Sequence, residues 1–218
     1  KGVIKMKAIK KLVIDEVDEM LNLGFRSQLR LILDLLPERR QNILFSATIT
    51  EDVEALIQEF FNHPVKIEAA RTGTPLEGIL QSLYEVPNFY TKLNLLKLLL
   101  RDTAMSKVLV FTATKQLADN IFEAIEADYN EQISVIHSNK TQNHRFEIVR
   151  QFNAGECRIL IATDVVARGI DVAEVTHVIN FDLPTVPENY IRRIRRTGRA
   201  DKKGTAIAFV TPAEKEIL

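Results

Sequence analysis

Short apolar runs alternate with amphipathic segments along most of the 218-residue chain. The apolar runs are rich in valine and isoleucine and mostly lack polar alternation, which is typical of strands buried on both faces. These runs occupy residues 11–16, 42–48, 107–114, 133–138, 158–164, 177–182 and 204–211. Segments of helical period occupy residues 51–61, 92–100, 115–129 and 141–152. This alternation predicts βαβ units, and therefore an α/β fold with a parallel sheet flanked by helices.

A composition shift divides the chain at residues 68–78. This segment, EAARTGTPLEG, is rich in glycine and proline and poor in apolar residues, so we predict that it is a linker. Residues 79–218 hold enough strands and helices for a complete α/β domain. Residues 1–67 hold only about three strands and two or three helices, so this part is interpreted as incomplete. Because the chain opens on Lys1 without an initiator methionine, we expect it to be a fragment.

The composition limits the possible classes of protein. Hydrophobic residues make up 46% of the chain, which is enough for a core, and 29 basic residues balance 29 acidic ones. Any anion-binding surface must therefore come from local clustering of charge. The single cysteine, Cys157, excludes an intrachain disulfide, and its apolar surroundings predict a buried, inert thiol. Because no membrane span or signal peptide is found, we expect a soluble protein of the cytoplasm with no membrane partner.

Polar groups follow several of the predicted strands. In a parallel α/β sheet, ligands bind beyond the carboxyl ends of the strands. The sequence DEVD (15–18) follows one run, and SAT (46–48) closes another. An acid pair after a buried strand suits a magnesium-nucleotide site, because one acid can hold the hydrated metal while the other takes a proton from water. Considered in isolation, the same pair more often caps the following helix.

Residues 190–200, YIRRIRRTGRA, carry five arginines. If this segment is helical, four of them share one face: Arg192, Arg195, Arg196 and Arg199. Like charges at these spacings repel each other, so the run is costly without an anionic partner. The alternative is a solvated basic face or a nonspecific RNA patch.

The motifs DEVD, SAT, ATDVVARGID (162–171) and the arginine run resemble, in this order and spacing, the DEAD-box RNA helicase family of superfamily 2. The resemblance covers the whole chain. It implies two RecA-like domains that close on ATP and RNA, with residues 1–67 forming the carboxyl-terminal part of the first, ATP-binding domain. Residues 79–218 would form nearly all of the second. ATP and magnesium would be the cofactors, and single-stranded or duplex RNA, held mainly by its backbone, would be the partner.

The resemblance assigns five residues to the nucleotide. Asp15 would hold magnesium through water, and Glu16 would be the general base for hydrolysis. Asp171 would accept a hydrogen bond from the ribose. Arg196 and Arg199 match arginine fingers, whose planar, always charged groups suit phosphate oxygens.

A second set would couple domain closure to strand separation, namely Asp18, Ser46, Thr48 and Arg192. For SAT, the alternative is an ordinary cap on the helix at 51–61, which Thr50 could equally supply.

A third set would line the RNA track, namely Thr114, Gln142, Arg145, Thr163, Arg168 and Gly169. Thr114 belongs to the motif VLVFTATK, and Gln142 and Arg145 match the family's Q-x-x-R on a helix. Considered singly, these last two residues are more simply explained as ordinary polar positions on a surface helix.

Three positions depart from the family pattern. Val17 replaces an alanine, Arg192 a histidine and Arg195 a glycine. We expect a small effect from Val17, and we hypothesise that Arg192 pairs with Asp18 in place of the histidine contact. Arg193, which the family also has, is expected to brace the motif internally.

One part of an ATPase is missing from the sequence. None of the eight glycines begins or completes G-x-x-x-x-G-K-[ST], so there is no P-loop to bind the phosphates, and the family's adenine-reading motif is absent too. We expect the chain alone to hydrolyse ATP negligibly, although its parent would be an ATP-dependent RNA helicase. The alternatives are a non-enzymatic RNA-binding module, against which the retained DEVD and SAT argue, and a DNA-directed superfamily 2 helicase.

Overall fold

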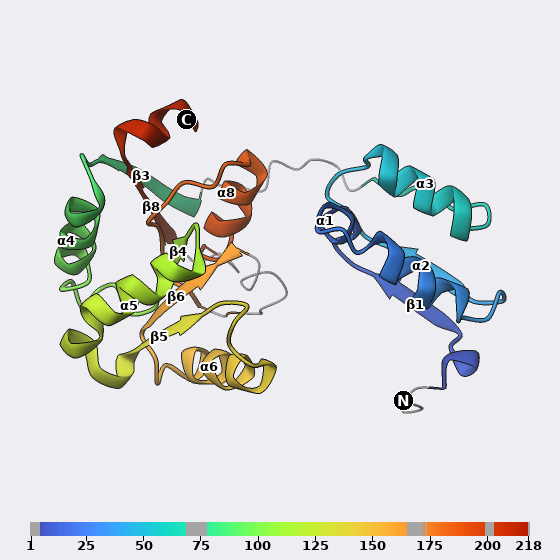
Figure 1. The fold of residues 1–218 in the computed structure, drawn as a ribbon, viewed down its shortest axis with the longest axis horizontal. Coiled ribbons are helices and arrows are strands. Elements are labelled where there is room, and N and C mark those ends of the chain that lie inside the picture. The colour runs from blue at the N-terminus through green and yellow to red at the C-terminus, as the bar shows by residue number, and fades with distance from the viewer. Residues whose placement is uncertain (1–4, 69–77, 165–171, 173, 199–202, 218) are drawn as a thin grey trace. The chain divides into compact units, whose positions relative to one another are not determined.

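The computed structural model describes residues 5–68, 78–164, 172, 174–198 and 203–217 (Figure 1). The chain divides into two units, Lys1–Ala70 and Arg71–Leu218. The division falls inside the segment predicted to be a linker. Most of that segment lies outside the described residues, so the linker and the exact domain limits stay predictions.

The second unit contains a sheet of six parallel strands in the order β3-β8-β7-β4-β6-β5, which confirms the predicted parallel sheet. Its strands are β3 (Ile79–Glu85), β4 (Val108–Thr112), β5 (Ile133–Ile136), β6 (Ile159–Thr163), β7 (His177–Asn180) and β8 (Gly204–Val210). β3 was not predicted from the apolar runs. It is an edge strand in which Leu80 is 70% exposed, so it lacks the uninterrupted apolar sequence of the central strands.

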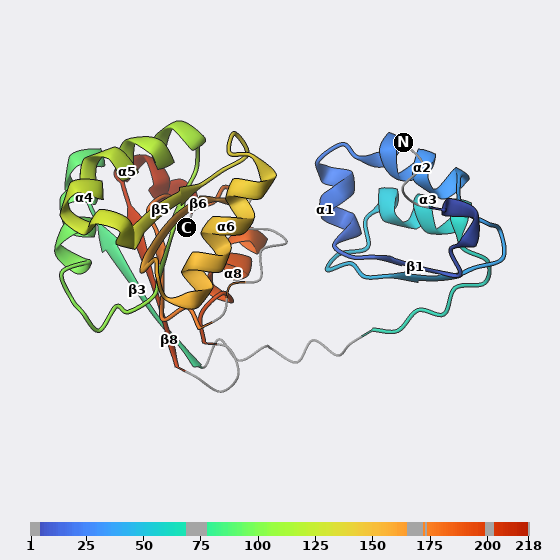
Figure 2. The ribbon, with the colours of Figure 1, turned by 90° about the horizontal axis from the view of Figure 1, so that it is seen from below.

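Helices cover both faces of this sheet, as expected (Figure 2). They are α4 (Phe89–Leu99), α5 (Lys115–Tyr129), α6 (Gln142–Ala154) and α8 (Pro187–Ile194), with short 3-10 helices η3 (Asn130–Gln132) and η4 (Pro212–Ile217). Side chains of α4 and α5 pack in one core cluster, whereas α6 and α8 contribute to others. No described helix is both long enough and apolar enough to cross a bilayer.

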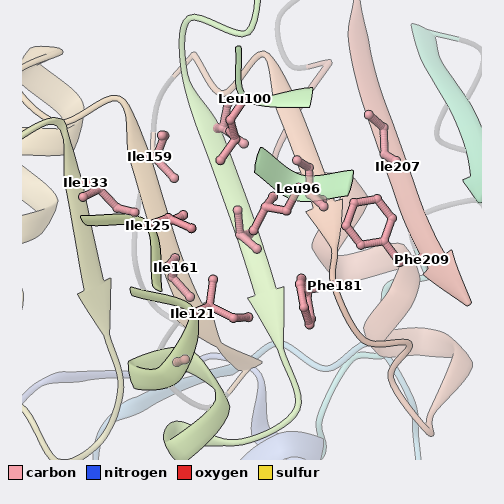
Figure 3. Packing of buried hydrophobic residues seen from close by; sticks show 14 of the residues in the cluster. Leu96, Leu100, Ile121, Ile125, Ile133, Ile159, Ile161, Phe181, Ile207 and Phe209 are labelled. Carbon is pink, nitrogen blue, oxygen red and sulfur yellow. The ribbon is translucent and has the colours of Figure 1, made fainter. Parts of the chain in front are cut away.

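The central strand β4 shows why the apolar runs do not alternate. Val108 and Val110 belong to the cluster that contains residues of α4 and α5, shown in Figure 3, and Leu109 and Phe111 belong to the cluster that contains residues of α6. Since neighbouring side chains of a strand point to opposite faces, a strand between two helical layers needs apolar residues at every position.

Cys157 is buried beside β6, as the sequence predicted. Burial raises the pKa of its thiol, so the reactive thiolate is disfavoured. The prediction of an inert thiol agrees with this environment.

The first unit has two parallel strands in its described part, β1 (Lys11–Ile14) and β2 (Gln41–Leu44), where about three were expected. Around them lie η1 (Met6–Ala8), α1 (Val17–Asn22), α2 (Arg26–Asp34) and α3 (Glu51–Phe60). Ile14 packs in the core with residues of the three α-helices, but Val13 and Ile43, which pair in register, are 59% and 37% exposed. This apolar pair on the sheet agrees with the interpretation of an incomplete domain, which stays a prediction.

A buried lysine joins η4 to the rest of the second unit. Lys92 of α4 is 3% exposed, and its Nζ lies 3.1 Å from Asp182 Oδ1 and 2.7 Å from Glu214 Oε2. Glu214 also accepts hydrogen bonds from the backbone and hydroxyl of Thr211. A buried charge is tolerated when it is paired and hydrogen-bonded in this way.

Glu214 makes the stability of this unit depend on acid. Burial by itself would raise the pKa of its carboxyl, but hydrogen bonds from Lys92 and Thr211 outweigh burial and hold the pKa below its ordinary value of 4.5. Because the pKa is lower in the folded than in the unfolded state, the stabilisation is fully present above the unfolded value and is lost as pH falls through the folded value.

We therefore expect Glu214→Gln to lower the melting temperature at pH 7 and to reduce its further decline below about pH 5. Glu216, an exposed carboxylate of the same η4 segment, provides the matched control Glu216→Gln. Thermal denaturation from neutral to acidic pH measures both effects. Identical pH profiles for wild type and Glu214→Gln would contradict this role of Glu214.

Candidate functional site

The acid pair lies directly after β1, and its backbone is constrained. Glu16 has φ 51° and ψ 43°, a left-handed conformation that is uncommon for a residue with a side chain. Its N–H donates to Asp15 Oδ1 at 2.9 Å, and its carbonyl accepts from the N–H groups of Glu19 and Met20, each at 3.1 Å. Such conformations persist where the surrounding structure enforces them, often at functional sites. Both acidic side chains are exposed at the end of the strand.

The DEVD and SAT motifs are joined to each other. Thr48 donates from its backbone N–H and its hydroxyl to Asp18 Oδ2, at 3.1 and 2.8 Å. Ser46 Oγ donates to the Thr48 carbonyl at 2.6 Å. Val17, the residue that departs from the family pattern, is fully buried in the core, and its N–H donates to the Phe45 carbonyl. The structure thus brings together three of the four predicted coupling residues, while the coupling role stays a prediction.

Thr50 caps α3, because its hydroxyl accepts from the Val53 N–H. The SAT segment is therefore not that cap, and the alternative explanation of this motif is wrong.

A hollow of about 370 Å³ opens at the carboxyl ends of β4, β5 and β6, beside the start of α5. It is lined by Ala113, Thr114, Lys115, Gln116, Ser138 and Thr163. Two residues predicted to bind RNA, Thr114 and Thr163, thus share one site. Sequence reasoning missed Lys115 and Ser138, although Ser138 closes a predicted strand and Lys115 directly follows Thr114.

Hydrogen bonds fix the rim of the hollow. Thr114 caps α5 by accepting from the Leu117 N–H at 3.1 Å, and the Thr112 hydroxyl donates to the Thr114 carbonyl at 3.2 Å. The Ala113 N–H donates to Asp182 Oδ2 at 2.9 Å. Asp182 is also a partner of Lys92, so a buried ion pair holds the turn that carries Thr114.

Gln142 and Arg145 lie in the first turn of α6, which Thr141 caps. Arg145 Nη1 donates to Gln142 Oε1 at 2.8 Å. Arg145 Nε is buried and has no acceptor among the residues that the structure describes. Buried donors are normally satisfied, so this N–H is an exception within the described residues.

The arginine run is helical only in part. α8 ends at Ile194, so the helical interpretation holds for Arg192 but fails for Arg195 and Arg196, and Arg199 lies outside the described residues. The chain leaves the helix because the buried Thr197 hydroxyl bonds to the Val175 carbonyl at 2.6 Å and Gly198 takes a left-handed φ of 68°. Gly204 permits this path, since a Cβ there would lie 2.4 Å from Thr197 Oγ1.

Arg193 is fixed inside the second unit. It is 2% exposed, and its guanidinium makes a two-pronged ion pair with Asp164, with both distances 2.7 Å. It also donates to Asn180 Oδ1 at 3.1 Å and to the Asp182 carbonyl at 2.7 Å, and it lies over the Phe111 ring. The expectation that Arg193 braces the motif internally agrees with these contacts.

The other arginines differ in exposure. Arg192 on α8 and Arg196 beyond it are half-buried, while Arg195, which caps α8, is exposed. The hypothesis that Arg192 pairs with Asp18 stays a prediction. The remaining predicted site residues, Arg168, Gly169, Asp171 and Arg199, lie outside the described residues and also stay predictions.

Family models match both parts of the chain. Residues 91–201 match the helicase conserved C-terminal domain, and residues 1–56 match the DEAD/DEAH box helicase model. ATP-dependent RNA helicase DbpA of Bacillus subtilis is 39% identical over 218 residues, which cover 100% of this chain and 45% of the relative. Eukaryotic initiation factor 4A-3 of Arabidopsis thaliana is 40% identical over 215 residues, with coverage of 99% and 52%. The chain thus spans about half the length of the curated relatives it matches.

Solved structures show the same relationship. Dbp5 of S. cerevisiae bound to RNA and ADP BeF3 has a TM-score of 0.83 and 32% identity, over 95% of this chain and 55% of that one. A DEAD box protein from the hyperthermophile Methanococcus jannaschii has a TM-score of 0.60 and 35% identity, over 99% and 58%. These likenesses confirm the predicted RecA-like class of fold.

Proposed function

Because this chain belongs to the DEAD-box RNA helicase family, we propose that it is part of an ATP-dependent RNA helicase. In the whole protein, ATP binding and hydrolysis would drive local separation of RNA strands. The proposed site of action is the cytoplasm.

The observation that best supports the proposal is the hydrogen bonding between the DEVD and SAT motifs. Asp18 accepts two hydrogen bonds from Thr48, and Glu16, two residues earlier, is held in a left-handed conformation. A module that only clamps RNA has no use for a constrained carboxylate at a nucleotide site. This arrangement therefore supports an ATPase over the non-enzymatic alternative.

The acidic residues suit the proposed cofactors, ATP and magnesium. Asp15 offers exposed, hard carboxylate oxygens that fit a hydrated magnesium ion, which neutralises charge on the phosphates when bound. Glu16 would take the proton from the attacking water, and Arg196 and Arg199 would bind phosphate oxygens. The P-loop that would cradle these phosphates is absent from the 218 residues.

RNA would lie along the second unit, which would hold it mainly through contacts to the sugar-phosphate backbone of the RNA. The hollow contains two hydroxyl-bearing residues of the predicted track, Thr114 and Thr163, and Arg145 keeps a buried donor. Hydroxyls and guanidinium groups are common donors to phosphate and sugar oxygens. Such contacts carry little base preference, so we propose that this part of the protein binds RNA without reading its sequence.

The test compares the 218-residue chain with the same chain extended upstream by a domain that carries the P-loop. The chain alone is expected to release phosphate at background, and the extended protein to hydrolyse ATP when RNA is added. Single-stranded RNA should stimulate more than DNA of matched sequence, because only RNA offers 2′-hydroxyls. Equal stimulation by DNA would favour a DNA-directed helicase. Absence of hydrolysis by the extended protein would favour the RNA-binding module.

A further inference from the structure

Lys115 borders the hollow but belongs to none of the predicted sets of residues. It is the first residue of α5, and its Nζ donates to Asn139 Oδ1 at 3.0 Å. Asn139 is a neutral acceptor, so this hydrogen bond positions the ammonium group without cancelling its charge. A cation in the first turn of a helix is also disfavoured by the helix dipole. The position is therefore costly unless an anion binds nearby.

Lys92 and Lys97 of the second unit are paired with carboxylates, whereas Lys107 Nζ donates to the Asn153 carbonyl. Lys92 contacts Asp182 and Glu214, and Lys97 contacts Asp128. Within the part of the chain that the structure describes, no carboxylate oxygen lies within 4.0 Å of Lys115 Nζ. Carboxylates therefore balance the positive charges of Lys92 and Lys97, whereas none of the described carboxylates balances the charge of Lys115.

The acid of α5 that is nearest to Lys115 in the sequence, Asp119, is bound to other residues. Asp119 lies one helical turn after Lys115, and its Oδ1 is 2.9 Å from His137 Nε2 and 3.7 Å from Lys140 Nζ. His137 is buried and directly follows β5, and its ring nitrogen Nδ1 accepts the Asn139 N–H at 3.4 Å. His137 and Lys140 therefore bind Asp119, so this acid does not pair with Lys115. The hydrogen bond between His137 and the Asn139 N–H also fixes the turn from which Asn139 accepts the Lys115 hydrogen bond.

We propose that Lys115 binds a backbone phosphate of RNA in this hollow and that Asn139 is a positioning residue that leaves its charge intact. The inference rests on the proposed function, since it assumes that the hollow holds RNA. The lining residues Thr114, Ser138 and Thr163 all carry hydroxyl groups, which can donate to phosphate oxygens. An ammonium group adds the long-range attraction that hydroxyls lack.

The test uses the 218-residue chain and a fluorescein-labelled single-stranded oligouridylate. Binding is followed by fluorescence anisotropy at salt concentrations between about 50 and 200 mM. A contact between one lysine and one phosphate contributes about 0.7 to the slope of log affinity against log salt for a single strand. Lys115→Gln is expected to weaken binding and to reduce the slope by about this amount. Lys97→Gln, which removes a lysine already paired with Asp128, is the control and should keep the wild-type slope.

Asn139→Asp tests the neutral partner, because it keeps the side-chain shape and adds a carboxylate beside Lys115. We expect it to weaken binding in the same direction as Lys115→Gln. A wild-type slope in Lys115→Gln would overturn the phosphate contact, and wild-type binding by Asn139→Asp would overturn the role of Asn139. If the wild-type chain itself fails to bind RNA, the proposed function of the hollow fails, which is a different result from either.

Discussion

Alanine in place of Arg196 is expected to lower kcat for RNA-stimulated ATP hydrolysis by about three orders of magnitude in the protein extended by its P-loop domain. A guanidinium group at the transferred phosphate stabilises charge that develops in the transition state. Arg196 follows the buried Arg193 and immediately precedes Thr197, which is 1% exposed and bonded to the Val175 carbonyl. Its backbone is thus anchored on both sides, as precise placement of a charged group requires.

The adjacent Arg195 supplies the control. It has the same chemistry but is exposed at the end of α8, and we expect Arg195→Ala to retain most of the activity. Arg196→Lys should stay far below wild type, because lysine lacks the planar, two-pronged donor geometry of arginine. Steady-state phosphate release at saturating ATP and RNA measures all three variants. A larger loss in Arg195→Ala than in Arg196→Ala would show that the finger has been assigned to the wrong residue.

Replacing Arg193 by alanine is expected to destabilise the second unit by about 3 kcal/mol or more, because removal of one partner leaves other buried polar groups unsatisfied. Arg193 satisfies Asp164, Asn180 and the Asp182 carbonyl together. Lysine cannot replace these contacts, since it has one donor atom where arginine uses three.

The effect is measured by urea denaturation followed by far-ultraviolet circular dichroism, which suits a chain without tryptophan. Arg150→Ala is the matched control. Arg150 also pairs with two carboxylates, Glu147 and Glu156, but it is exposed, so its loss should destabilise the chain much less than the loss of Arg193. Similar urea midpoints for the Arg193 and Arg150 variants would contradict the anchoring role of Arg193.

The central strands could be predicted from the sequence because burial on both faces leaves an uninterrupted apolar run, as in β4. The edge strand β3 was not predicted, because an exposed strand can carry polar residues and therefore lacks an uninterrupted apolar run. The helical interpretation of the arginine run failed beyond Ile194, since a bond between Thr197 and Val175 overrides local periodicity. No pattern of nearby residues reports a contact across 22 positions.

The candidate site shows the same division between local and long-range information. Asp18 and Thr48 were grouped only through family resemblance, and the structure shows them in direct contact. Lys115 was missed because its significance depends on Asn139, a residue 24 positions away that accepts its hydrogen bond. The buried set around Lys92 was equally hidden, with partners 90 and 122 positions away.

The pairing of the first strand of the second unit with its last has a consequence for synthesis of the protein. β3 pairs with β8 along its whole length, from Ile79 opposite Gly204 to Glu85 opposite Val210, and one of the two acids paired with Lys92 is Glu214 of η4. While the ribosome is still making residues 204–217, β3 has no neighbouring strand and Lys92 lacks Glu214. The nascent second unit therefore has to remain open until residues 204–217 emerge, with unpaired strand edges exposed to chaperones and to other chains.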